Sequence, residues 1–386
     1  MTKKLLSAGS TLFLIFGFGV SAINTRAQSN AAAANPSPKK AEEVFKNIQV
    51  LKGIPSDQVF PTMQFITASL GVECDFCHVR DAFEKDDKKP KATARKMMEM
   101  MFAINADNFD RRRAVTCYSC HRGSVQPMAI PAVMIEEPKE PMGEPHRAEG
   151  DKKSSEAKES TGPTADQLLD KYIQAVGGAS AVDRISSRVM KGSIDFGGKS
   201  LPIDIYAKDP EKRISLTRMP NGDSVTAFNG KEGWLGTPGR PLREMHGSDL
   251  DGAAIDADLH LATHLKQMFS KMQVRGSKKI DDHQAYEVVG DRESKTPIEL
   301  YFDAQSGLLV RLVRYGDTAL GWLPTQIDYA DYREANGVKI PYRWTLARPS
   351  GKFTIQVNEM QQNIPVDDAK FVKPEAPQEQ PKATTK

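Results

Sequence analysis

The stretch Cys74-Asp-Phe-Cys77-His78 is the most informative part of the sequence about its first half. The same pattern occurs a second time as Cys117-Tyr-Ser-Cys120-His121. The 386 residues contain four cysteines, and all four lie in these two tight pairs rather than scattered as a disulfide framework would have them. Two cysteines at this spacing followed directly by histidine are the attachment pattern of c-type haem. The sequence therefore predicts two covalently attached haems c. The predicted cofactor-binding residues are Cys74, Cys77, Cys117 and Cys120, and the predicted iron ligands are His78 and His121.

Paired cysteines at this spacing also occur in zinc sites and in thioredoxin-like dithiols. A redox dithiol lies where a strand turns into a helix, whereas Cys74 follows a helical segment that ends at Gly71. A four-cysteine zinc site needs no histidine after both pairs. Haem attachment is the interpretation that uses every residue of the motif, and a zinc site is the alternative.

The residues around the two motifs have helical periodicity. Apolar residues recur at steps of three and four from about Ala41 onward, and strand signals are few. Pro61 suits the start of a helix and Gly71 its left-handed end, and a second helix is predicted from Pro90 to about Asn105. We therefore predict that residues 41–131 form an all-α dihaem cytochrome c domain.

The sixth ligand of each iron decides between electron transfer and reaction with a small ligand, and methionine sulfur closes that position. Met63 lies in the helix before the first cysteine pair. The candidates before the second pair are Met97, Met98, Met100 and Met101. A flexible thioether also packs well in an irregular core, so most of these side chains need not bind metal.

The stretches 63–78, 94–105 and 115–123 resemble the cytochrome subunit of bacterial photosynthetic reaction centres, and the likeness extends over about residues 41–127. In that family a helix that carries the distal methionine precedes each haem motif. The resemblance implies that Met63 binds the first iron and Met97 the second. The family has four haems in two pairs and one distal histidine, whereas this chain has two motifs and no histidine between them. The resemblance thus implies haem ligation without implying docking to a photosystem.

The first 27 residues have the pattern of an export signal. Lys3-Lys4 precedes an apolar stretch, Leu12 to Val20, and small residues follow near Ala22 and Ala27. Cleavage after either alanine is expected to release a periplasmic protein whose residues 28–40 form a flexible arm. The alternative is that the apolar run from residue 5 to 22 is retained as an anchor, in which case alone the protein associates with the membrane.

Beyond residue 131 the composition of the chain changes first, and its apolar periodicity changes after that. Residues 132–163 are rich in Glu, Pro, Lys and Ser, which predicts a disordered charged linker. Thr164 and Gln167 have the spacing of a capping box that opens a helix, and one further helix is expected over about 251–270. Between and beyond these, apolar residues alternate with period two. Turn signals separate the alternating segments, at Asn229-Gly230, Ser306-Gly307 and Asn336-Gly337.

We therefore predict an antiparallel β-rich α+β domain over 164–375, followed by a polar tail at 376–386. Its order of elements, with Tyr172 to Gly178, resembles the curved half-barrel of lipoprotein-sorting carriers. The resemblance implies a concave face that can hold an acyl chain, and hence a lipid or lipoprotein ligand. The alternative is a scaffold that docks the haem domain to an envelope partner. His260 and His264 lie four residues apart and could bind zinc, although a packing or surface role is the simpler interpretation.

Composition excludes several classes of protein. Hydrophobic residues make up 39% and charged residues 27%, so neither a multi-span membrane protein nor a wholly disordered chain fits. Lys3, Lys4 and Arg26 carry the net charge of +3, and basic and acidic residues balance beyond them. A neutral body gives no electrostatic reason to expect nucleic acid as a partner.

We expect an electron carrier rather than an enzyme, with redox proteins of the cell envelope as partners. The attachment sites lie 43 residues apart, which in one compact helical domain favours electron transfer between the haems. A dihaem peroxidase is one alternative, but it needs one iron with an open position and usually carries its haems in two domains. A lipid- or lipoprotein-binding envelope protein with a haem redox module is the other.

Overall fold

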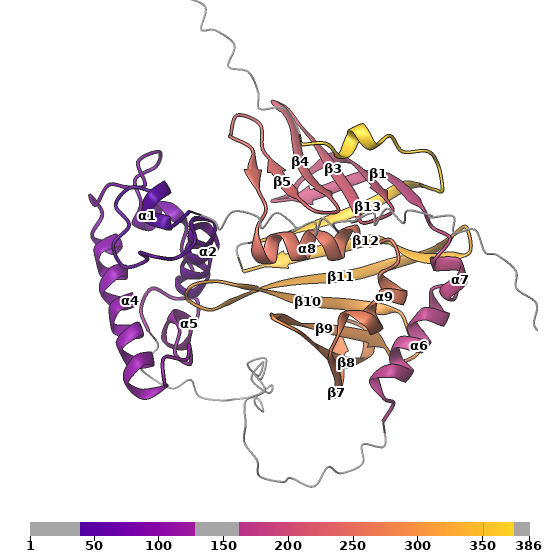
Figure 1. Ribbon diagram of the computed structural model, residues 1–386, viewed down its shortest axis with the longest axis horizontal. Helices are drawn as coiled ribbons and strands as arrows, with labels where there is room; N and C mark the ends of the chain where they lie inside the picture. Colours follow the sequence, from indigo (N-terminus) through magenta and orange to yellow (C-terminus); the bar gives the residue numbers. More distant parts are fainter. Residues whose placement is uncertain (1–38, 128–161, 350, 374–386) are drawn as a thin grey trace, which may run out of the picture. The chain divides into compact units, whose positions relative to one another are not determined.

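The computed structural model describes residues 39–127, 162–349 and 351–373. From Lys39 on, the described residues belong to one compact unit in which helices come first and a large sheet follows (Figure 1). This order confirms the predicted fold class, an all-α region followed by an antiparallel α+β region. The predicted signal peptide, most of the arm, the bulk of the linker and the polar tail lie outside the described residues.

The haem-motif region is built from helices. Its elements are α1 (Ala41–Val44), η1 (Ser56–Gln58), α2 (Val59–Leu70), α3 (Cys74–Cys77), α4 (Lys89–Asn108) and α5 (Cys117–His121). Gly71 ends α2 with a φ of 66°, as predicted. The helix begins two residues before Pro61, since amides of the first turn need no partner within the helix and a proline fits there. Pro90 lies in the first turn of α4.

Thirteen strands in the described part of the chain form a single antiparallel sheet. They are β1 (Ser187–Phe196), β2 (Lys199–Lys208), β3 (Lys212–Met219), β4 (Gly222–Asn229), β5 (Gly233–Gly236), β6 (Arg243–Glu244), β7 (Lys271–Ile280), β8 (His283–Arg292), β9 (Lys295–Asp303), β10 (Leu309–Asp317), β11 (Trp322–Ala335), β12 (Val338–Arg348) and β13 (Gly351–Gln362). Their order is β6-β5-β4-β3-β2-β1-β13-β12-β11-β10-β9-β8-β7. Every neighbouring pair but one is consecutive in sequence, and the exception places β1 beside β13.

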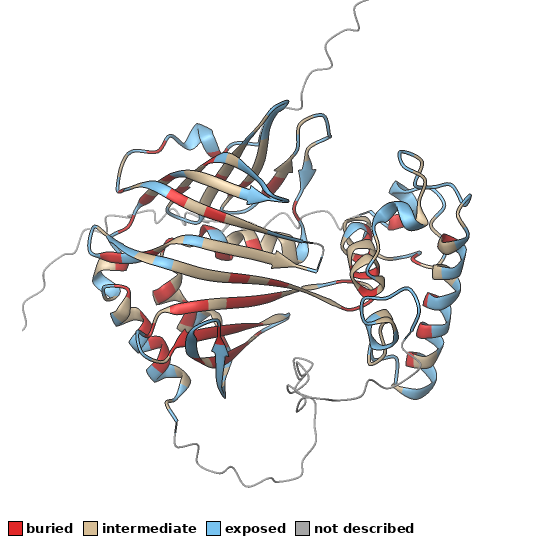
Figure 2. Cartoon of the chain, turned by 180° about the vertical axis from the view of Figure 1, so that it is seen from behind, coloured by how far each residue is buried: buried red, intermediate tan, exposed pale blue. Residues whose placement is uncertain are grey.

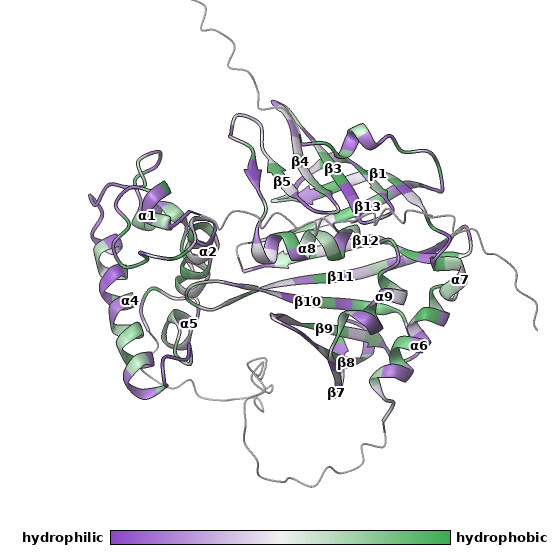
Figure 3. Ribbon diagram, in the orientation of Figure 1, coloured by the Kyte–Doolittle hydropathy of each residue, from purple (hydrophilic) through white to green (hydrophobic). Residues whose placement is uncertain are grey.

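The predicted turns lie between strands. Asn336 and Gly337 both have positive φ, 50° and 80°, and join β11 to β12, as a tight hairpin requires. Gly230 and Gly307, with φ of 95° and 77°, lie in the turns after β4 and β9. Apolar and polar residues interleave along the strands, as Figure 3 shows.

Helices cover the sheet. They are α6 (Ala165–Ala175), α7 (Ala179–Val182), α8 (Gly247–Ala257) and α9 (Leu261–Met268), with η2 (Asp368–Phe371) near the end. The capping box of α6 is formed, with the Gln167 amide donating to Thr164 Oγ1 at 3.2 Å. The single helix predicted over 251–270 is wrong: it is two helices. Asp258 is extended and its carboxylate accepts the His260 amide at 2.8 Å, which ends α8 and starts a new turn.

The main core lies between α6, α9 and strands β8 to β12. Leu169, Leu265, Leu300 and Leu312 are wholly buried there, and buried residues follow these strands in Figure 2. Helix α8 contacts β3, β4 and β10, strands from both halves of the sheet. The sheet is therefore curved around this helix.

The tip of the β10–β11 hairpin reaches the haem-motif helices. Leu320 is wholly buried in a cluster with Phe65, Ile66 and other residues of α2 and α4. Arg113 pairs with Asp317 at 2.6 Å beside it. The sheet thus supplies part of the core of the helical region.

Candidate functional site

The first cysteine pair forms one helical turn, and the histidine follows it. The His78 amide donates to the Cys74 carbonyl at 3.0 Å, which closes the turn. The His78 Nδ1 lies 2.9 Å from the Phe83 carbonyl oxygen. Since a carbonyl only accepts, Nδ1 carries the hydrogen and Nε2 keeps its lone pair. His78 Nε2 is therefore the ring atom available to a metal.

The second motif repeats this arrangement. Cys117 to His121 form α5, and His121 Nδ1 lies 3.0 Å from the Ser124 carbonyl oxygen. The same ring atom, Nε2, is again left free. A metal-binding histidine characteristically donates its other ring N–H to a carbonyl or carboxylate, which fixes the orientation and tautomer of the ring. Both motifs have this support.

The thiols lie near the surface and form no disulfide. Cys74 and Cys120 are exposed, and Cys77 and Cys117 are half-buried. Burial raises the pKa of the Cys77 and Cys117 thiols, so both are protonated at neutral pH. The four thiols do not converge on one point within the described residues, so the four-cysteine zinc alternative is not supported.

The surface around the motifs suits a porphyrin. Among the described residues, ten of the twelve exposed large apolar side chains lie in the haem-motif region. They are Val44, Phe45, Phe60, Phe76, Phe83, Met97, Met100, Phe102, Tyr118 and Val125. Exposed apolar side chains gathered in one region of a chain are typical of a region that binds an apolar group. The residues present therefore fit haem.

The methionines divide between core and surface. Met98 and Met101 are 6% and 5% exposed and pack in the cluster around Phe65 and Ile66. Met97 and Met100 are 40% and 50% exposed on the same helix. Met98 and Met101 therefore have a packing role in the core, and Met97 and Met100 are the two candidates whose side chains are exposed. Met63, on α2, is half-buried and packs against the same cluster.

Two glycines bring α2 and the second motif into backbone contact. The Gly123 amide donates to the Ser69 carbonyl at 2.9 Å. A Cβ on Gly71 would lie 2.2 Å from the Gly123 carbonyl oxygen, so no other residue fits. The helix that carries Met63 precedes the first motif in sequence and packs against the second, a contact that no local sequence pattern predicts.

Comparison with known proteins finds relatives of the haem-motif region. Residues 20–211, just under half of the chain, match the family model described as the photosynthetic reaction centre cytochrome C subunit. The haem-motif region resembles that cytochrome family. The match extends beyond residue 127, where the resemblance was expected to end.

Two curated relatives show the extent of the likeness. The photosynthetic reaction center cytochrome c subunit of Thermochromatium tepidum is 36% identical over 99 residues, which are 25% of this chain and 24% of that protein. Cytochrome c-554 of Chloroflexus aurantiacus is 33% identical over 85 residues, 20% of each chain. The chain thus spans about a quarter or less of the length of these relatives.

Solved structures match slightly more than half of the chain at low similarity. A DUF1329 family protein from Desulfovibrio piger covers 54% of this chain and 96% of its own, with 15% identity and a TM-score of 0.38. A LolA superfamily protein from Nitrosomonas europaea covers 55% of this chain and 99% of its own, with 15% identity and a TM-score of 0.37. Scores below 0.5 do not establish a common fold.

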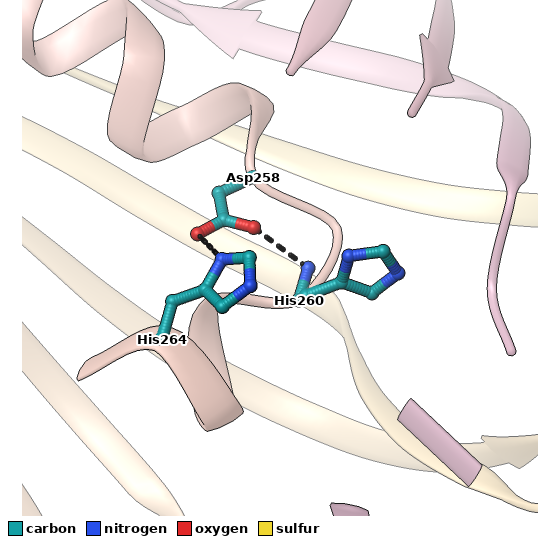
Figure 4. A group of neighbouring side chains, drawn as sticks. All are labelled: Asp258, His260 and His264. Carbon is teal, nitrogen blue, oxygen red and sulfur yellow. Dashed lines mark hydrogen bonds and ion pairs between the residues drawn. The ribbon is translucent and has the colours of Figure 1, made fainter. Parts of the chain in front are cut away.

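His260 and His264 lie together with Asp258, as Figure 4 shows. Asp258 accepts from His264 Nδ1 at 2.9 Å, and His260 Nε2 donates to the Ile185 carbonyl at 2.8 Å. One ligand atom from each of the three lies within 4.8 Å of the others, so the group could hold a cation. These hydrogen bonds also fix the junction of α8 and α9, which is the packing role expected from the sequence.

The curved sheet encloses a cavity of about 440 Å³. Its walls come from α6 to α9, from β1 to β5 and from β10 to β13, and they are mostly apolar. Four arginines also line it: Arg188, Arg213, Arg314 and Arg348. A concave face is expected from the sequence, but no pattern in the sequence marks these four arginines as part of it. In the part of the chain that the structure describes, no helix is long and apolar enough to cross a membrane.

Proposed function

We propose that the chain is an exported c-type electron carrier that passes electrons between redox proteins of the cell envelope through two covalently attached haems. The observation that carries this proposal is the repeated histidine geometry, in which a carbonyl holds Nδ1 of His78 and of His121 and leaves Nε2 free. Haem iron, when bound, supplies a reversible one-electron step. We place this activity in a haem domain at 41–131, with the sheet domain at 164–375.

In the proposal Met63 and Met97 are the sixth ligands. Met97 is exposed beside the buried face of α4, so its thioether is not used by the protein core. An iron whose sixth position is occupied by methionine has no site for peroxide, which favours electron transfer over a peroxidase reaction. The chain's part is to fix both imidazoles, supply the thioethers and exclude water from the metal.

The cavity in the sheet favours a second candidate function, the binding of a lipid or lipoprotein acyl chain. Its volume lies within the range of ligand pockets, which is about 300–1,000 Å³, and its walls are mostly apolar. The first function does not require this cavity.

Spectroscopy of the purified holoprotein tests the electron-carrier proposal. We expect low-spin spectra and the weak long-wavelength ferric band of methionine ligation, with about half the band lost in Met63→His and the other half in Met97→His. Met100→His is the matched control on the same helix and should leave the band intact. Rapid binding of carbon monoxide by the unaltered protein would falsify the closed-site proposal and favour a peroxidase-like enzyme.

A further inference from the structure

Two neighbouring arginines that line the cavity form no direct ion pair, although Arg213 lies close enough to Asp256 to help lower the pKa of that carboxyl. Arg188 on β1 and Arg213 on β3 both lie opposite Ala207 of β2, so the three side chains share a row on one face of the sheet. Neither guanidinium lies within 4.0 Å of a carboxylate among the described residues. Burial lowers the pKa of Arg188 to about 10, and burial also lowers that of Arg213. Both still carry their charge at neutral pH.

The same row contains buried polar atoms without hydrogen bonds. Gln362 of β13 lies opposite Arg188 and is 6% exposed. Five buried side-chain atoms in the described residues lack a partner, and three of them are Arg188 Nε and the two amide atoms of Gln362. Buried polar groups are nearly always paired, and Arg188 is the residue of this pair that lines the cavity, so its unpaired Nε indicates a polar group supplied by a ligand there.

The carboxylates that line the cavity are already engaged. Asp256 pairs with Arg314 through two bonds, of 2.7 and 2.9 Å. Asp249 pairs with Arg243 at 2.9 Å, and Asp258 accepts from His264. The remaining charge in the cavity is therefore positive. Its counterpart is an anion.

The rest of the lining is suited to a hydrocarbon chain. It includes Ile203, Leu309, Ile327, Trp344, Leu346 and Ile355. A ligand for this cavity combines an anionic end at the row of Arg188 with an apolar body along these side chains. Apolar lining with a few converging polar groups is the usual composition of a specific ligand site.

We propose that the cavity binds a single-chain amphiphile with an anionic head group, held by Arg188 and Arg213, and with its alkyl chain against the apolar strands. This inference rests on the lipid-binding candidate above and specifies its ligand class. A fatty-acid carboxylate and an alkyl phosphate share the required chemistry. Charge-assisted hydrogen bonds from two guanidinium groups suit either head group.

Calorimetry on the delipidated, haem-bearing full chain tests the proposal with three probes of one chain length: dodecanoate, dodecyl phosphate and dodecanol. We expect one site that binds the better of the two anions at least about tenfold more tightly than the alcohol, the effect of one or two charged hydrogen bonds. The two anionic probes show which head group is preferred. Equal binding of anions and alcohol would overturn the head-group proposal while leaving the lipid candidate in place.

Variants locate the head group. The double variant Arg188→Met, Arg213→Met should lose about tenfold or more in anion affinity and change dodecanol affinity by less than about threefold. Arg218→Met is the matched control: Arg218 is on the same strand as Arg213, pairs with Asp204 and Asp223, and does not line the cavity. An unchanged anion affinity in the double variant contradicts the proposal.

If that variant does not fold, the comparison of the three probes on the unaltered chain decides. Absence of binding by all three probes overturns both the inference and the lipid candidate, whereas the haem spectra judge the electron-carrier proposal independently.

Discussion

At the scale of single residues, the two motifs are organised around the carbonyl oxygens that hold the histidines. Phe83 and Ser124 follow their histidines by five and three residues, so each support is local. A ring fixed in this way does not need to reorient when it binds iron. The imidazoles are pre-oriented by the chain itself.

Removal of one cysteine pair should remove one haem. The variant Cys117→Ser, Cys120→Ser lacks both thioether bonds of the second site, so we expect its mass to fall by one haem and its iron content to fall from two per chain to one. Intact-mass spectrometry and iron analysis measure this. The corresponding Cys74, Cys77 variant is the control and should lose the same mass. Two haems retained in either variant would contradict the assignment.

The six motif residues are predicted from sequence because their chemistry depends on local spacing, and the structure places each cysteine pair in one short helix. The methionines were harder, since Met97 and Met98 are neighbours in sequence and only the packing against Phe65 separates core from surface. The row of Arg188 and Arg213 could not be predicted, because it depends on the register of β1, β2 and β3. An arginine in a strand with alternating polarity is otherwise expected on the solvent face.

At the scale of elements, the contact between α2 and the second motif depends on a glycine. Gly71 has positive φ and no room for a side chain, whereas Gly53 has a φ of 84° and open space around it. A side chain at Gly53 would meet only the strain of positive φ, whereas a side chain at Gly71 would also clash with the Gly123 carbonyl oxygen.

Gly71→Ala should destabilise the haem-motif region more than Gly53→Ala. The second variant carries only the cost of positive φ, about 1 kcal/mol, while the first must also displace the Gly123 carbonyl, which we expect to add roughly 1–3 kcal/mol. Thermal unfolding followed at the haem absorption measures the difference. Equal melting temperatures would show that the close approach is not required.

The pair between Asp256 of α8 and Arg314 of β10 joins a helix to the curved sheet. Burial alone would raise the pKa of Asp256, but Arg314 and Arg213 outweigh it and hold the pKa below its usual value. A carboxyl with a depressed folded-state pKa stabilises the fold above its unfolded pKa, about 3.9, and the effect is lost as pH falls through the folded value.

Asp256→Asn should therefore destabilise the protein at pH 7 by about 2 kcal/mol, since it leaves the 8%-exposed Arg314 without its partner. The difference from the unaltered protein should begin to shrink below about pH 4, where the Asp256 carboxyl of the unfolded chain takes up a proton, and should be lost as pH falls through the lowered folded-state pKa. Urea unfolding at pH 7 and pH 3 measures both values. Asp331→Asn breaks the more exposed pair with Arg333 and should cost under about 1 kcal/mol.

At the scale of the whole molecule, the order of helical and sheet regions follows from the change of period in the sequence. The division into α8 and α9 did not, because a single carboxylate at Asp258 decides it. The pairing of β1 with β13 and the burial of Leu320 among the haem-motif helices join residues far apart in sequence. No local pattern encodes such contacts.

Leu320→Ala should weaken both regions together. The side chain is wholly buried, and truncation of a buried leucine costs about 2–5 kcal/mol. We expect a lower unfolding temperature in the haem absorption and in the far-ultraviolet signal of the sheet alike. Phe196→Ala, at the exposed end of β1, is the control and should change stability by less than about 0.5 kcal/mol. A normal haem transition in Leu320→Ala would show that the hairpin contact contributes nothing.

The place of β13 next to β1 has a consequence for biogenesis. If the chain is exported as proposed, β1 can pair with β13 only after Gly351–Gln362 have crossed the export channel, whereas both cysteine pairs cross it long before. Pairing between such distant segments is also slow. In the proposed dihaem protein, haem attachment would therefore have an interval in which both motifs are accessible while the sheet that follows them is still incomplete.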